Sequence, residues 1–279
     1  IWSPDGKWFT LEFIGNRHDP YSDIGMVSAQ GGKVINLTNS GYTSGSPRWV
    51  LDGNAILFIT ERYGMRAHAS WGSLNDVMLV FMNQDAYDKF RLSKEDYELQ
   101  KELEKEQKSI TETKKNDKKK GDNKNKSEEK KEEKTKDIIV ELDNIEDRIV
   151  RLTPNSSDLG SAIITKNGET LYYLSAFEGG YDLWKMNLRK KDTKLLHKMD
   201  AGWANMEMDK DGKNLFLLGG SSMQKMSTDS ESLKPVSYQA NVKMDLAAER
   251  DYMFSHVYKQ EQKRFYNLNM HGVNWDAIT

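Results

Sequence analysis

Cysteine is absent from this sequence of 279 residues, which excludes disulfide bonds, thiolate zinc sites and a cysteine nucleophile. Its absence fits both a reducing and an oxidising compartment. Long apolar runs are missing as well: none approaches the roughly 20 residues of a membrane-spanning helix, so we expect no membrane span. An excess of positive charge is also missing, since 41 basic residues face 43 acidic ones and the net charge is −2. The overall charge therefore gives no support to a dedicated nucleic-acid-binding protein, and we expect no nucleic-acid partner.

A short repeat is present. Four segments place an Asp-Gly or Asn-Gly turn before an apolar strand, the pattern of a β-hairpin: Ile1 to Leu11 ("IWSPDGKWFTL"), Pro47 to Phe58, Ala162 to Tyr173 and Glu207 to Leu218. The turn glycines Gly6 and Gly53 are 47 residues apart, and Gly168 and Gly212 are 44 residues apart, which is the period of a four-stranded propeller blade. The middle interval is much longer and indicates an insertion.

Each unit also ends in a second hairpin. Ile24 to Ser28 is followed by Val34 to Thr38 ("VINLT"), and Tyr181 to Asn187 is followed by Thr193 to His197. Short alternating strands with glycine-rich turns and no helical pattern between them favour an all-β fold over a doubly wound one. We therefore predict a β-propeller of four-stranded blades, of which this chain holds about four at residues 1–243, and we expect further blades upstream.

The insertion is predicted at about residues 93–136. It follows the strand Val77 to Met82, begins with helix-like text from Leu92, and continues as an interleaved Lys/Glu/Asp/Asn tract that cannot bury enough apolar surface to fold. We interpret the tract as a disordered, solvated loop in preference to a binding element. Strands are expected to resume at Asp137 ("DIIVEL") and Ile149 ("IVRLT").

The pattern changes at Met244. Asp245 to Tyr266 has apolar residues at helical spacing with charges between them, and Asp245 is a suitable N-cap. This pattern predicts that residues 244–279 open a helical domain.

Residue types that carry chemistry are present without a recognisable constellation. None of the five histidines has a metal-ligand spacing such as H-E-x-x-H, and no G-x-S-x-G pentapeptide occurs; these histidines are His18, His68, His197, His256 and His271. Gly179-Gly180 lacks the Lys-Ser/Thr that follows in a phosphate-binding loop. We therefore predict no catalytic, metal-binding or cofactor-binding residue in this chain, and no cofactor.

The remaining candidates have structural interpretations. Asp5, Asp52, Asp209 and Asp211 lie in the repeat turns, where an aspartate hydrogen-bonds its own turn. Three tryptophans occupy repeat or strand positions and are expected to pack between blades: Trp49, Trp184 and Trp203.

Two motifs together resemble a known family. The repeat "WSPDGKW" (Trp2 to Trp8) is similar to the propeller repeat of the Tol-associated periplasmic protein and of tricorn-type proteases. The final segment, Phe265 to Ile278 ("FYNLNMHGVNWDAI"), resembles the "M-H-G-V-x-W" segment that follows the second propeller of tricorn proteases. Glu61 to Asn83 and the charged insertion after it also look like bacterial tricorn homologues.

This resemblance implies part of a serine peptidase of the tail-specific type, a hydrolase whose propeller guides or filters peptide substrates. It also implies PDZ-like and peptidase domains further along the same chain, with the Ser/His pair beyond Thr279, so that His271 is not the catalytic histidine. A homo-oligomer and a cytoplasmic location follow from the same resemblance, with the periplasm left open. Two alternatives remain at this point: a non-enzymatic Tol-associated propeller that binds proteins or peptides, and a prolyl-oligopeptidase propeller, which predicts G-x-S-x-G directly after the blades.

Overall fold

The computed structural model describes residues 1–15, 21–66, 72–118 and 137–277. The chain divides into two compact units, Ile1–Val236 and Ser237–Thr279. None of the helices in the described residues is long and apolar enough to cross a membrane.

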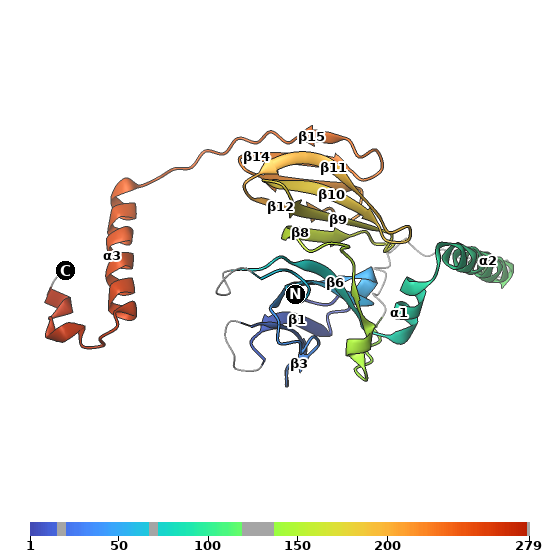
Figure 1. The fold of residues 1–279 in the computed structure, drawn as a ribbon, viewed down its shortest axis with the longest axis horizontal. Coiled ribbons are helices and arrows are strands. Elements are labelled where there is room, and N and C mark those ends of the chain that lie inside the picture. The colour runs from blue at the N-terminus through green and yellow to red at the C-terminus, as the bar shows by residue number, and fades with distance from the viewer. Residues whose placement is uncertain (16–20, 67–71, 119–136, 278–279) are drawn as a thin grey trace, which may run out of the picture. The chain divides into compact units, whose positions relative to one another are not determined.

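The first two sheets are built from consecutive antiparallel strands (Figure 1). The first sheet has three strands in the order β1 (Trp8–Phe13), β2 (Asp23–Ser28) and β3 (Ile35–Asn36). A single bridge between Trp2 and Phe9 extends it on the β1 side. The second sheet has four strands in the order β4 (Ser44–Val50), β5 (Ala55–Thr60), β6 (Asp76–Phe81) and β7 (Ile149–Arg151).

The other two sheets repeat this four-stranded arrangement. The third sheet consists of β8 (Asp158–Ile164), β9 (Thr170–Ala176), β10 (Tyr181–Asn187) and β11 (Asp192–Ala201). The fourth consists of β12 (Ala204–Met208), β13 (Asn214–Gly219), β14 (Ser222–Ser227) and β15 (Leu233–Pro235). Sequential meandering sheets of this kind are propeller blades, and the predicted fold class is confirmed.

Alternation along the strands places a hydrophobic core on each side of a blade. Ile56 and Phe58 face the first sheet, whereas Leu57 between them belongs to the core shared with the third sheet. In β9, Tyr172 faces the fourth sheet and Tyr173 faces the second. Because successive strand residues point to opposite faces, one short apolar run supplies two interfaces and the blades stack as continuous layers.

In each of the first two blades, a buried carboxylate at the start of a strand is hydrogen-bonded to a threonine that follows the last strand of the blade. Asp23 accepts a hydrogen bond from the Thr38 hydroxyl at 2.8 Å, and Asp76 accepts one from the Thr153 hydroxyl at 2.7 Å. In the third blade, Asp182 occupies the corresponding strand start and accepts from the backbone N–H groups of Met199 and Asp200 instead. This contact gives a physical reason for the threonine that ends the segments "VINLT" and "IVRLT" in the first two blades.

The insertion leaves the second blade after β6 and contains α1 (Gln84–Arg91) and α2 (Lys94–Lys118). Asn83 caps α1 by accepting from Ala86 N–H at 2.9 Å. The helical pattern predicted from Leu92 is thus confirmed as α2. Residues 119–136 lie outside the described part of the chain, so their disorder stays a prediction.

The strand predicted at Asp137 is wrong, since residues 137–142 form no strand. Ile138 N–H donates to the Asp5 carboxylate at 3.0 Å, and Glu141 N–H donates to the Met82 carbonyl at 2.7 Å. The Gln84 N–H in turn donates to the Glu141 carboxylate at 2.8 Å, so the two ends of the insertion lie side by side. The predicted strand at Ile149 is confirmed as β7.

The second unit contains α3 (Leu246–Arg264). Asp245 caps it as predicted, accepting from the N–H groups of Ala247 and Ala248 at 3.1 and 3.2 Å. Two short 3-10 turns follow, Met270–Gly272 and Trp275–Ala277. Stacking of Tyr258 on Trp275, with ring centroids 5.2 Å apart, holds the second turn against the helix.

Candidate functional site

The histidines of the described residues form no catalytic constellation. The ring Nε2 of His197 lies 2.9 Å from the Glu231 carbonyl oxygen, His256 packs on Tyr252, and His271 contacts Tyr266. His18 and His68 lie outside the described residues. The part of the chain that the structure describes also holds no group of three or more side chains arranged to bind a metal.

Turn aspartates behave as predicted at two positions. Asp209 accepts from the N–H groups of Lys213 and Asn214, and Asp5 accepts from Lys7 N–H at 3.1 Å. A hydrogen bond from the Asn214 side chain, assisted by these N–H groups, lowers the pKa of the Asp209 carboxyl. The Asp209 carboxylate is therefore committed to its turn, whereas Asp5 also accepts from Ile138 N–H.

Two of the three tryptophans pack as expected. Trp49 lies against the core between the first and second sheets, and Trp184 lies against the core between the second and third. Trp203 is 51% exposed, so its predicted core position is wrong. It follows the last residue of β11 by two positions and lies at the connection to β12, where the chain crosses the surface between blades.

The first strands of the second, third and fourth blades border a cavity of about 320 Å³. The Arg48 guanidinium on β4 makes two hydrogen bonds, at 3.0 and 2.7 Å, with the Glu207 carboxylate on β12. This ion pair joins the second and fourth blades, although the third blade lies between them in sequence. The contact is possible because β4 and β12 border the same cavity. Charges of both signs surround it: Asp52, Lys166, Asp209 and Lys210 also line the cavity.

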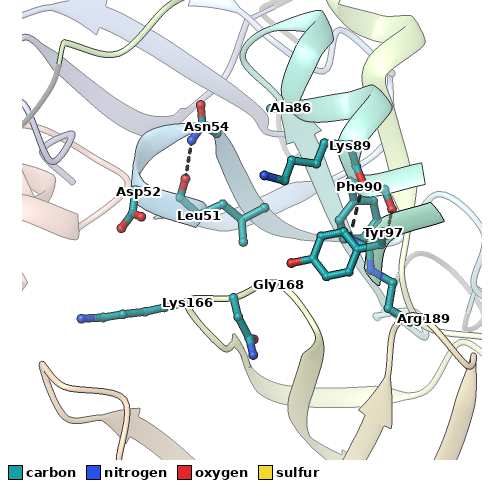
Figure 2. Close-up of a pocket in the computed structure, with 11 residues that line it drawn as sticks. Leu51, Asp52, Asn54, Ala86, Lys89, Phe90, Tyr97, Lys166, Gly168 and Arg189 are labelled. Atoms are coloured by element: carbon teal, nitrogen blue, oxygen red, sulfur yellow. Dashed lines mark hydrogen bonds between the residues drawn. The ribbon is translucent and has the colours of Figure 1, made fainter. Parts of the chain in front are cut away.

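A second cavity, which we call the Leu51 pocket, has a volume of about 260 Å³ and lies where the insertion helices meet two blade turns. Figure 2 shows Lys89 and Tyr97 extending from the helices toward Leu51. Its lining combines apolar and polar groups: Leu51, Asp52, Asn54, Ala86, Lys89, Phe90, Tyr97, Lys166, Asn167, Gly168 and Arg189. This pocket could not be predicted from the sequence, since its residues come from four separate stretches of chain.

Arg189 attaches the insertion to the third blade. Its Nη1 donates to the carbonyls of Phe90 and Leu92 at 2.5 and 3.1 Å, and its guanidinium stacks 4.0 Å from the centre of the Tyr97 ring. Carbonyls at the end of a helix have no partner within the helix, so an arginine is a suitable cap for α1. The Arg189 Nε is buried and has no hydrogen-bond partner.

Comparison with known proteins gives a consistent result. Residues 246–279 match the family described as the Tricorn protease C1 domain. The fold is similar to that in the crystal structure of the tricorn protease, with a TM-score of 0.62 at 10% identity over 96% of this chain and 24% of that one. TolB from Acinetobacter baumannii is also similar, with a TM-score of 0.51 at 9% identity over 85% of this chain and 43% of TolB.

Sequence similarity to a curated protein is local. A stretch of 56 residues is 39% identical to the "Uncharacterized peptidase YuxL" of Bacillus subtilis (strain 168), which is 20% of this chain and 8% of that protein. The chain thus spans less than a tenth of YuxL and about a quarter of the tricorn protease.

Together these observations define a class: a β-propeller followed by a segment that matches the Tricorn protease C1 domain. The resemblance to tricorn-type proteases predicted from the sequence is confirmed, with the C1 match at residues 246–279 and a propeller similar in fold to part of the tricorn protease.

Proposed function

We propose that this chain is the propeller portion of a tricorn-like serine peptidase and that it guides or filters peptides toward peptidase domains further along the same polypeptide. The observation that carries the proposal is the C1 match at residues 246–279 directly after the propeller blades. A Tol-associated propeller would share the blades, but the C1 segment favours the peptidase.

In this proposal the residues of the present chain bind and orient peptide, and they perform no bond cleavage. The described histidines His197, His256 and His271 make no hydrogen bond to a serine hydroxyl. Cleavage would use a serine nucleophile with a histidine base and backbone N–H groups that stabilise the oxyanion, all located in the later domains. We propose a homo-oligomeric, cytoplasmic assembly with PDZ-like and peptidase domains as intramolecular partners.

The cavity at β4, β8 and β12 offers a physical basis for guiding peptides. Charged groups of both signs border it, and Arg48 and Glu207 hold each other in an exposed ion pair whose partners are 36% and 62% exposed. Such a pair is worth little in water and exchanges readily with charged groups of a passing peptide. The surface thus supports transient contact with peptides of varied charge in preference to tight binding of one sequence.

One test is the reading frame beyond Thr279, which should encode a PDZ-like and an α/β peptidase region. Its absence over the next few hundred residues would contradict the proposal.

A second test uses this chain alone with fluorogenic peptides of mixed sequence. We expect no turnover above the buffer blank, because the catalytic groups are placed elsewhere. Turnover that a serine-directed inhibitor blocks would show that the chain itself carries an active site.

A further inference from the structure

The Leu51 pocket adjoins the cavity at β4, β8 and β12, with which it shares Leu51, Asp52 and Lys166, and its wall contains backbone strain that the equivalent turns lack. In the turns of the first, third and fourth blades, Gly6, Gly168 and Gly212 adopt positive φ angles of 68°, 70° and 74°. The turn of the second blade adds two non-glycine residues in this region, Leu51 at 53° and Asp52 at 54°. Left-handed conformations are costly for residues with a side chain and concentrate at functional sites.

This conformation directs Leu51 into the pocket. A β-carbon on Gly168 would lie 3.0 Å from Leu51 Cδ2, so the leucine packs closely against the neighbouring turn. Together with Ala86 and Phe90 it forms an apolar floor. A volume of about 260 Å³ is slightly below the range of about 300–1,000 Å³ typical of small-molecule sites, and is suited to a ligand the size of one amino-acid residue.

Hydrogen-bond donors dominate the polar part of the pocket. Lys89 reaches toward Leu51 (Figure 2), and its ammonium has three donors, of which the Glu104 carboxylate accepts one at 2.7 Å. Tyr97 directs its hydroxyl toward the same space. The buried Arg189 Nε is a donor without an acceptor, and a buried group of this kind calls for a partner.

The other charged groups that line the pocket leave donors in excess over acceptors beside the helices. Lys166 donates to the Lys210 carbonyl at 2.5 Å and is directed away from Tyr97. Of the described lining residues, Asp52 is the single acid, and it lies on the far side of Leu51 from the helices (Figure 2). A ligand that matches an apolar floor beside cationic and hydroxyl donors has a carboxylate and an apolar side chain.

We propose that the Leu51 pocket binds such a carboxylate, supplied either by the C-terminal residue of a peptide or by a free N-acylated amino acid. The apolar side chain contacts Leu51 and Phe90, and the carboxylate accepts from Lys89 and Tyr97. Where the source is a peptide, this inference rests on the proposed function, and the part of the peptide that is recognised is its C-terminal residue.

The experiment titrates this chain with N-acetyl-phenylalanine, with its uncharged amide, and with a heptapeptide ending in phenylalanine, and follows binding by saturation-transfer NMR. We expect the acid to bind in the millimolar range and the amide to bind at least fivefold more weakly. Binding of the peptide together with the acid identifies a peptide terminus as a source, whereas binding of the acid alone identifies the free amino acid. Equal binding of acid and amide would overturn the proposal.

Variants locate the site. Lys89→Gln should weaken binding of the acid three- to tenfold and Tyr97→Phe about threefold, whereas Glu104→Gln should strengthen it by removing a competing carboxylate. Lys234→Gln, at an exposed position on β15, is the matched control and should change nothing. Should Lys89→Gln fail to fold, Tyr97→Phe still decides the matter, since it keeps the ring that stacks on Arg189.

The outcomes separate this inference from the proposed function. If the heptapeptide binds and neither Lys89→Gln nor Tyr97→Phe weakens it, the pocket is not the site and the role of the propeller in guiding peptides stands. If no probe binds, the pocket assignment fails while the test on the reading frame remains independent.

Discussion

Single buried carboxylates hold the strands of these blades together. Asp76 is fully buried and accepts hydrogen bonds from Arg151 Nε and Nη2 at 3.0 and 2.8 Å, from Thr153 at 2.7 Å, and from Ser156 at 2.7 Å. These donors compensate the negative charge of the buried Asp76 carboxylate. The hydrogen bonds from Arg151 also hold β7 against the start of β6. Loss of the carboxylate charge leaves the buried Thr153 hydroxyl and the half-exposed Arg151 guanidinium with a weaker acceptor.

We therefore expect Asp76→Asn to lower the free energy of unfolding by about 2–3 kcal/mol, measured by urea denaturation. Asp211→Asn, at an exposed turn position, should stay within about 0.5 kcal/mol of the parent chain. Equal effects of the two substitutions would contradict a special role for Asp76.

Glu231 provides a pH-dependent contribution. Hydrogen bonds from Lys185 and then Lys194 lower the pKa of the Glu231 carboxyl below its ordinary value of 4.5. Because the folded state favours the charged form, the contribution is present above the unfolded pKa and is lost as the pH falls through the folded pKa.

We expect Glu231→Gln to be less stable than the parent chain at pH 7 and the difference to shrink as the pH falls below about 4.5. Urea denaturation of both proteins between pH 7 and pH 3 measures this. A difference that is constant over the range would show that the carboxylate charge has no part in it.

At the scale of elements, Arg189 of the third blade contacts both insertion helices. It caps α1 and stacks on Tyr97 of α2, so its loss weakens the attachment of both helices, while the packing of α1 on the core remains.

We predict that Arg189→Ala accelerates chymotrypsin cleavage at Tyr87, Phe90 and Tyr97 at least about tenfold, because local opening exposes these sites. Lys190→Ala, at the neighbouring exposed position, is the control. Unchanged cleavage of the Arg189 variant would mean that the helices are held by other contacts.

Elements of this fold differ in how far the sequence determines them. Turn glycines and alternating apolar strands made the blades and their period predictable, since these signals are local. The strand predicted at Asp137 does not form. Ile138, Ile139 and Val140 favour strands intrinsically, but the N–H groups of this segment donate to the Asp5 carboxylate and the Met82 carbonyl and no ladder forms. The Leu51 pocket was not predictable, because Leu51, Tyr97 and Arg189 meet only through tertiary contacts.

At the scale of the propeller unit, Arg48 and Glu207 couple two blades that are not neighbours in sequence. Both side chains are exposed, so the energy of the pair is limited by solvent and by salt.

A double-mutant cycle of Arg48→Ala and Glu207→Ala should give a coupling energy of about 0.5–1 kcal/mol at low ionic strength and much less in 1 M salt. Coupling that is absent at low salt would show that the pair does not bind the blades to each other.

The adjacent ends of the insertion have a consequence for how this protein can vary. Gln84 and Glu141 are hydrogen-bonded to each other, so the insertion begins and ends at the same place on the second blade. The entropy of closing a loop grows slowly, by about 0.6 kcal/mol for each doubling of its length. α1 must be kept, because Ala86, Tyr87 and Phe90 pack on the core of the blade. Between α2 and Asp137, by contrast, the chain can be lengthened, shortened or replaced by a foreign domain at small cost to the blade.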